Sequence, residues 1–72
     1  MSRARELAGA ADSTDPAVGL AAVAALRGLL EEIEARQVDH ARALGWSWEA
    51  IASALGVRRQ SVHRKHARRH RR

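Results

Sequence analysis

Apolar residues recur every three or four positions over a long central segment, which is the period of one face of an α-helix. The segment begins at Asp15-Pro16 and continues to Leu44. Asp15 can accept hydrogen bonds from the amides of a first turn, and Pro16 suits the first helical position because its missing N–H would have no partner there. The pattern predicts one long helix over residues 15–44.

Seven positions of this helix, most of them apolar, have the spacing of the a/d seam of a short coiled coil. They are Val23, Leu26, Leu30, Ile33, Gln37, His40 and Leu44, with polar residues at two of the seven places. A chain of this size buries a small core, so we predict that a second copy covers the seam in a homodimer. The predicted dimer interface consists of Val23, Leu26, Leu30, Ile33 and Gln37. The alternative is that these side chains cover a core within one chain.

The segments on either side of this helix have different patterns. Residues 1–14 mix glycine, aspartate, serine and threonine with small residues and show no sustained apolar period, which predicts a flexible N-terminal arm or a frayed helical turn. After the long helix, Gly45 is predicted to end it in a left-handed conformation and Ser47 to cap a short helix over about residues 48–55. Trp46 and Trp48 are predicted to be core residues rather than groups that stack on DNA bases.

Positive charge is concentrated at the C-terminus. Residues 1–49 carry five arginines and eight acidic residues, a net −3, whereas residues 50–72 carry eight basic residues and no acid, a net +8. A polyanion such as duplex DNA favours a basic cluster of this kind because neutralising its phosphates releases condensed counterions. By itself the cluster is equally typical of a solvated tail with unspecific affinity for nucleic acid.

The motif that precedes the basic cluster favours specific recognition. Ile51-Ala52, Leu55-Gly56-Val57 and Val62 place a small residue at a helix crossing, glycine at a turn and aliphatic side chains at the contacts. This pattern resembles the helix-turn-helix of sigma-factor region four, of invertase-type recombinases and of short actinobacterial regulators. There are two departures: Arg58 stands where the family often has a serine or threonine cap, and Lys65 stands where an apolar residue often closes the core, leaving its stem or His66 to do so.

The residue pattern and the resemblance together predict an all-α fold with three parts: a flexible arm over 1–14, a long amphipathic dimerisation helix over 15–44, and a helix-turn-helix with a basic tail over 45–72, of which the resemblance implies the last. The recognition helix is expected over about residues 58–69, with Val62 facing inward and Ala67 facing outward. The residues expected to contact base edges are Arg59, Gln60, His63 and Arg64. Those expected to contact phosphates are Ser47, Arg58, Lys65, Arg68, Arg69, Arg71 and Arg72.

The predicted function is therefore a homodimeric, sequence-specific transcription regulator that binds double-stranded DNA. The alternatives are a protein-interaction module and an unspecific nucleoid-coating or RNA-binding protein. No enzyme constellation, cofactor site or small-molecule site is evident, and His63, His66 and His70 lack the further ligands of a metal site. Without cysteine, signal peptide or membrane span, the chain is expected to be cytoplasmic and associated with the nucleoid.

Overall fold

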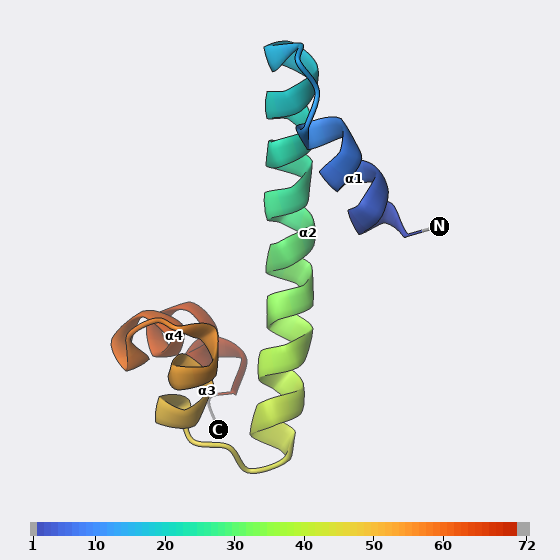
Figure 1. Ribbon diagram of the computed structural model, residues 1–72. Helices are drawn as coiled ribbons and strands as arrows, with labels where there is room; N and C mark the ends of the chain where they lie inside the picture. The colour runs from blue at the N-terminus through green and yellow to red at the C-terminus, as the bar shows by residue number, and fades with distance from the viewer. Residues whose placement is uncertain (1, 71–72) are drawn as a thin grey trace. The chain divides into compact units, whose positions relative to one another are not determined.

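The computed structural model describes residues 2–70, and of Arg69 and His70 only the backbone. Its elements are helices α1 (Arg3–Ala11), α2 (Pro16–Ala43), α3 (Trp48–Leu55) and α4 (Arg59–His66), followed by a short 3-10 helix, Ala67–His70 (Figure 1). Over the described range the protein is therefore all-α, as the sequence predicts. The chain forms two compact units, an N-terminal unit up to Glu34 and a C-terminal unit from Ala35, and α2 contributes to both.

Helix α1 lies where the sequence predicts a flexible arm, and it corrects that prediction. Ser2 caps the helix, because its Oγ accepts a hydrogen bond from the Arg5 amide at 3.1 Å. At the other end, the Asp12 amide donates to the carbonyls of Gly9 and Ala10. The segment is rich in alanine, which has the highest helix propensity of all residues but contributes little to an apolar period. Propensity and capping therefore form this helix without a strong amphipathic pattern.

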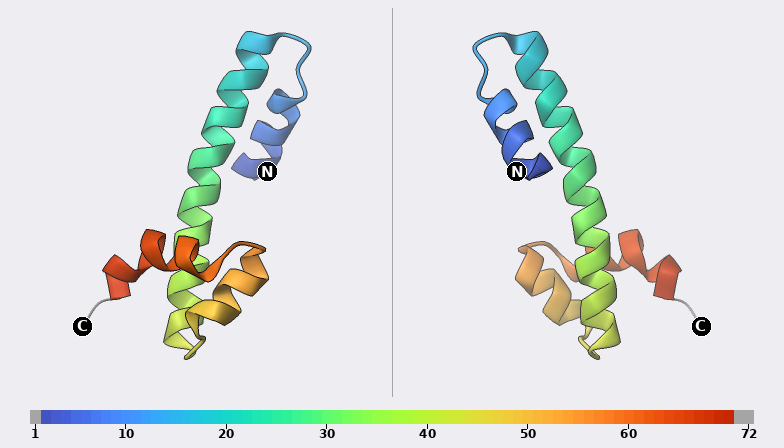
Figure 2. Two further views of the ribbon diagram at one scale, coloured as in Figure 1. Left: turned by 90° about the vertical axis from the view of Figure 1, so that its left-hand side faces the viewer. Right: turned by 90° about the vertical axis from the view of Figure 1, so that its right-hand side faces the viewer.

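Within the N-terminal unit, α1 runs beside the first half of α2 (Figure 2). The connection ends at Asp15, whose Oδ1 accepts a hydrogen bond from the Ala17 amide at 3.0 Å, so the predicted cap is confirmed. Gly19 and Ala22 are buried on the α2 side. A Cβ at Gly19 would lie 3.5 Å from the Ala11 carbonyl oxygen, so the end of α1 is within van der Waals contact of this position.

Local signals define the turns of the C-terminal unit. Gly45 follows α2 with φ +89°, the left-handed conformation predicted for it. Ser47 caps α3, because its Oγ accepts a hydrogen bond from the Ala50 amide at 3.0 Å. Gly56 ends α3 with φ +72°, and its amide donates to the carbonyls of Ala52 and Ser53. Left-handed backbone favours glycine, which has no Cβ, so both glycines fix the chain reversals at these points.

One apolar cluster holds the C-terminal unit together. It consists of Val38 from α2, Ile51 and Ala52 from α3, and Val62 from α4, with Ala41 and Trp48 packed against it. Trp48 is half-buried, in agreement with the predicted core role. Trp46 is 44% exposed, so the same prediction is wrong for this residue. The difference arises because Trp46 precedes the Ser47 cap and lies in the turn rather than on the inner face of α3.

Candidate nucleic-acid interface

Helix α4 begins with backbone hydrogen bonds and without a side-chain cap. Arg58 occupies the cap position but makes no side-chain capping hydrogen bond. Its carbonyl accepts hydrogen bonds from the amides of Ser61 and Val62, at 3.1 and 3.3 Å. The α-helical part ends at His66 and the chain tightens into the 3-10 helix, so regular α-helix covers only part of the predicted range of residues 58–69. The Arg58 side chain is exposed to solvent and is not used to cap the helix.

Val62 and His66 form the inner face of α4, and each is only 2% exposed. They are four residues apart, so their side chains lie on the same side of the helix. His66 therefore takes the buried place that Lys65 leaves open, one of the two arrangements that the sequence allows. Among the described residues, no buried side-chain nitrogen or oxygen lacks a hydrogen-bond partner. The buried imidazole is thus accommodated as part of the packed core.

His63 does not lie on the outward face predicted for it. Its ring is half-buried and meets the Trp48 ring edge to face, with centroids 5.3 Å apart and planes at 86°. Ala67, predicted to share that outward face, is also half-buried. Successive residues of an α-helix are about 100° apart, so His63 lies beside the sector centred on Val62 and His66 rather than opposite it. A base contact by His63 would require its imidazole to leave this aromatic contact.

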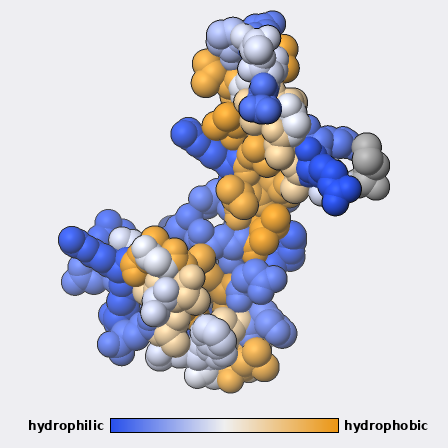
Figure 3. All heavy atoms as spheres, viewed as in Figure 1, coloured by the Kyte–Doolittle hydropathy of each residue, from blue (hydrophilic) through white to orange (hydrophobic). Residues whose placement is uncertain are grey.

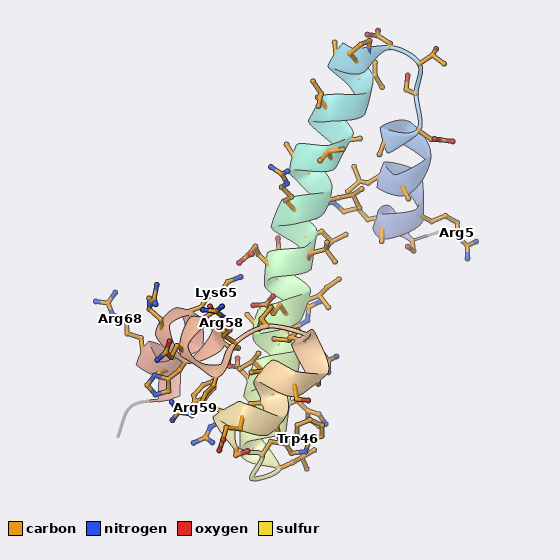
Figure 4. The ribbon with its side chains drawn as sticks, turned by 60° about the vertical axis from the view of Figure 1, so that its left-hand side comes forward. Arg5, Trp46, Arg58, Arg59, Lys65 and Arg68 are labelled. Carbon is orange, nitrogen blue, oxygen red and sulfur yellow. The ribbon has the colours of Figure 1, made fainter. Side chains whose placement is uncertain are left out.

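The remaining predicted base contacts are exposed. Arg59, Gln60 and Arg64 all present their side chains to solvent, and Arg68 is exposed in the 3-10 helix that follows. Gln60 and Arg64 are four residues apart on the side of α4 opposite Val62. Figure 4 shows Arg68 extending away from the protein and Arg59 near the start of the helix. Three of the four residues predicted to contact bases are therefore accessible to a ligand.

Sequence reasoning missed the role of Arg42 in holding this unit together. The guanidinium carbon of Arg42 lies 4.8 Å from the centroid of the Trp48 ring, within the range of a cation–π contact. Nη1 of the same side chain donates to the Trp46 carbonyl at 2.7 Å. Trp48 thus contacts Arg42 of α2 and His63 of α4 while belonging to α3. The one available signal was the presence of arginine in the last turn of a helix, where carbonyls accept side-chain donors.

The predicted phosphate contacts fall into two groups. Ser47, Arg58, Lys65 and Arg68 are exposed. The side chains of Arg69, Arg71 and Arg72 lie outside the described residues. No acidic residue follows Glu49 in the sequence, so α4 and the 3-10 helix themselves carry only basic or neutral side chains. A polyanion would meet no carboxylate from α4 or from the 3-10 helix.

The predicted dimer residues differ in exposure within a single chain. Val23, Leu26 and Ile33 are half-buried, whereas Leu30 is 61% exposed and Gln37 is also exposed. Figure 3 shows hydrophobic side chains along the first half of α2. The intramolecular alternative therefore accounts for part of the seam, because α1 lies beside this half of α2 (Figure 2). It does not account for Leu30.

Two further properties bear on function. Within residues 2–68, whose side chains the structure describes, no group of three histidine, aspartate or glutamate side chains is placed to hold a metal ion. No helix in the same range combines the length and the apolar character needed to cross a membrane. Comparison with known proteins adds no identification: no family model matches the chain, and no curated protein or solved structure shows significant similarity to it.

Proposed function

We propose that this protein binds double-stranded DNA, with α3, the Gly56 turn and α4 acting as a helix-turn-helix. The observation that carries the proposal is the two-sided character of α4. Val62 and His66 anchor one side in the core, while Gln60 and Arg64 occupy the other side and are exposed. A basic helix fixed on its inner face and polar on its outer face suits insertion into the major groove.

The side chains proposed to read bases are Arg59, Gln60 and Arg64. An arginine guanidinium can form two hydrogen bonds with O6 and N7 of guanine, and a glutamine amide can do the same with N6 and N7 of adenine. His63 is left out of this set because its ring packs on Trp48. The set of residues proposed to contact bases is therefore smaller than the set that the sequence pattern predicts.

The other exposed cations are proposed to hold the DNA backbone. Arg58 precedes α4 and Arg68 follows it, so the two bracket the helix that enters the groove. Phosphate contacts fix the position of a protein on the duplex without selecting a sequence. We further propose that two copies act together as a homodimeric transcription regulator, with each α4 in one of two successive major grooves.

The proposal is tested by selecting bound sequences from random duplexes with the full chain. We expect an enriched motif, and a loss of affinity of about 5- to 150-fold for the best site when Gln60 or Arg64 is replaced by alanine. Arg5→Ala is the matched control, because Arg5 is an exposed helical arginine in the other unit. This control should bind the selected site like the parent chain.

Two results would contradict this function. If no motif is enriched and affinity depends only on salt and on the arginines after Ala67, the protein is an unspecific nucleic-acid binder. If the chain binds no duplex at low salt, the interaction-module alternative is favoured. Because Gln60 and Arg64 are exposed, their replacement should leave the circular dichroism spectrum unchanged, so misfolding would be recognised separately.

A further inference from the structure

We infer that α1 and the α2 helix of a second copy compete for the same stripe of α2, so that release of α1 strengthens self-association. The inference builds on the proposed homodimer but not on DNA binding. It assigns α1 a role that the sequence pattern does not suggest. The surface concerned is the part of the a/d seam that lies within the N-terminal unit.

The first observation is the position of Gly19 in the heptad repeat. Gly19, Leu26 and Ile33 are separated by seven residues each, so all three are d positions of one seam. Gly19 is buried, and a Cβ there would lie 3.5 Å from the Ala11 carbonyl oxygen and 3.6 Å from that of Ser13. The end of α1 and the turn after it therefore occupy a position at which a partner helix would pack.

The second observation is how little apolar surface α1 contributes. None of its residues is buried, and its one large apolar residue, Leu7, is only half-buried. The α2 helix of a second copy would instead supply Val23, Leu26 and Leu30. Apolar burial stabilises by about 25 cal/mol per Å², so exchanging α1 for this helix increases the favourable contact.

The third observation concerns the later part of the repeat, from Leu30 to Leu44, which is accessible while α1 stays in place. Leu30 and Leu44 are 61% and 64% exposed, respectively, and Gln37 and His40 between them are polar. These positions span two heptads, whereas a stable coiled coil needs about three or more. Release of α1 uncovers Gly19 and extends the accessible seam toward the half-buried Val23 and Leu26. A second copy is therefore the occupant that gains most when α1 leaves.

The experiment measures self-association of the full chain by sedimentation, without DNA. Leu7→Gln and Ala10→Gln change the two half-buried positions of α1 that lie three residues apart, and neither alters the seam of α2 itself. We expect each to weaken the packing of α1 on α2 and to lower the dimer dissociation constant by about tenfold or more, because more molecules have the seam accessible. The matched control is Ala8→Gln, which should associate like the parent because Ala8 is exposed.

The inference is overturned if Leu7→Gln and Ala10→Gln leave the dissociation constant unchanged or raise it. It is also overturned if Ala8→Gln gives the same gain, since a general change in α1 would then explain it. In the Leu7→Gln chain, Leu30→Gln should remove the gain. Both tryptophans lie in the C-terminal unit, so their fluorescence reports separately that this unit stays folded. Failure of DNA binding would appear in the Gln60 and Arg64 variants and leave this result untouched.

Discussion

The two halves of α2 are covered in different ways. In the N-terminal unit, Gly19 and Ala22 are the buried α2 residues beside α1, so the helices approach through small residues. In the C-terminal unit, Val38 packs with branched and aromatic side chains of α3 and α4. Close approach brings backbones together but removes little apolar surface from water, whereas branched side chains remove much more. We therefore expect α1 to open locally at a lower free energy than α3 and α4.

The largest expected effect comes from shortening one apolar side chain in each unit. Ile51 is 3% exposed, so Ile51→Ala should lower the free energy of unfolding by about 3 kcal/mol through lost burial and the cavity left behind. Leu7 is half-buried, and Leu7→Ala should cost about 1 kcal/mol. Urea unfolding followed by circular dichroism measures both. Equal losses for the two variants would show that the units are equally well packed.

A smaller effect is expected from two glycines that differ in backbone conformation. Gly56 has φ +72°, so Gly56→Ala forces a Cβ into the left-handed region and should destabilise the C-terminal unit by about 1–2 kcal/mol. Gly28 lies within α2, where a Cβ meets nothing within 4 Å. Gly28→Ala should therefore stabilise the chain by about 1 kcal/mol. Thermal unfolding of both variants tests the opposite signs, and a loss at Gly28 would reveal a contact at that position.

Local sequence signals predicted most of the element ends. Asp15 and Ser47 accept the hydrogen bonds predicted for them, and Gly45 has the predicted left-handed conformation. Each of these features depends on residues within a few positions of one another, so the sequence alone contains the necessary information. The predicted ranges for the long helix and the short helix accordingly lie within a residue of α2 and α3.

The missed features depend on contacts between distant residues. Nothing near Leu7 indicates that α1 lies beside α2, because the contact is made at Gly19, twelve residues later. The position of His63 depends on how α4 crosses α3, since the Trp48 ring comes from the other helix. Helical periodicity placed Val62 inward correctly but did not specify how wide the buried sector is. For the candidate site, the sequence thus predicted which residues are basic more reliably than which of them are accessible.

The smallest expected effect on stability comes from replacing the N-cap serine in each of the two units. Ser47 and Ser2 make equivalent hydrogen bonds, because Oγ of Ser47 accepts from the Ala50 amide at 3.0 Å and Oγ of Ser2 accepts from the Arg5 amide at 3.1 Å. Ser47→Ala should cost about 1 kcal/mol of global stability, because α3 carries part of the core. Ser2→Ala should change global stability by only a few tenths of a kcal/mol, because α1 can fray while the rest stays folded.

Amide hydrogen exchange distinguishes these two outcomes residue by residue. In the Ser2→Ala chain, exchange should accelerate over Arg3–Ala11 and stay unchanged over Trp48–Leu55. In the Ser47→Ala chain, exchange should accelerate across α3 and α4 together, because both helices contribute to one apolar cluster. If Ser2→Ala instead accelerated exchange across α3, the two units would unfold as one. The contrast between a weakly held α1 and a firmly packed C-terminal unit would then have to be given up.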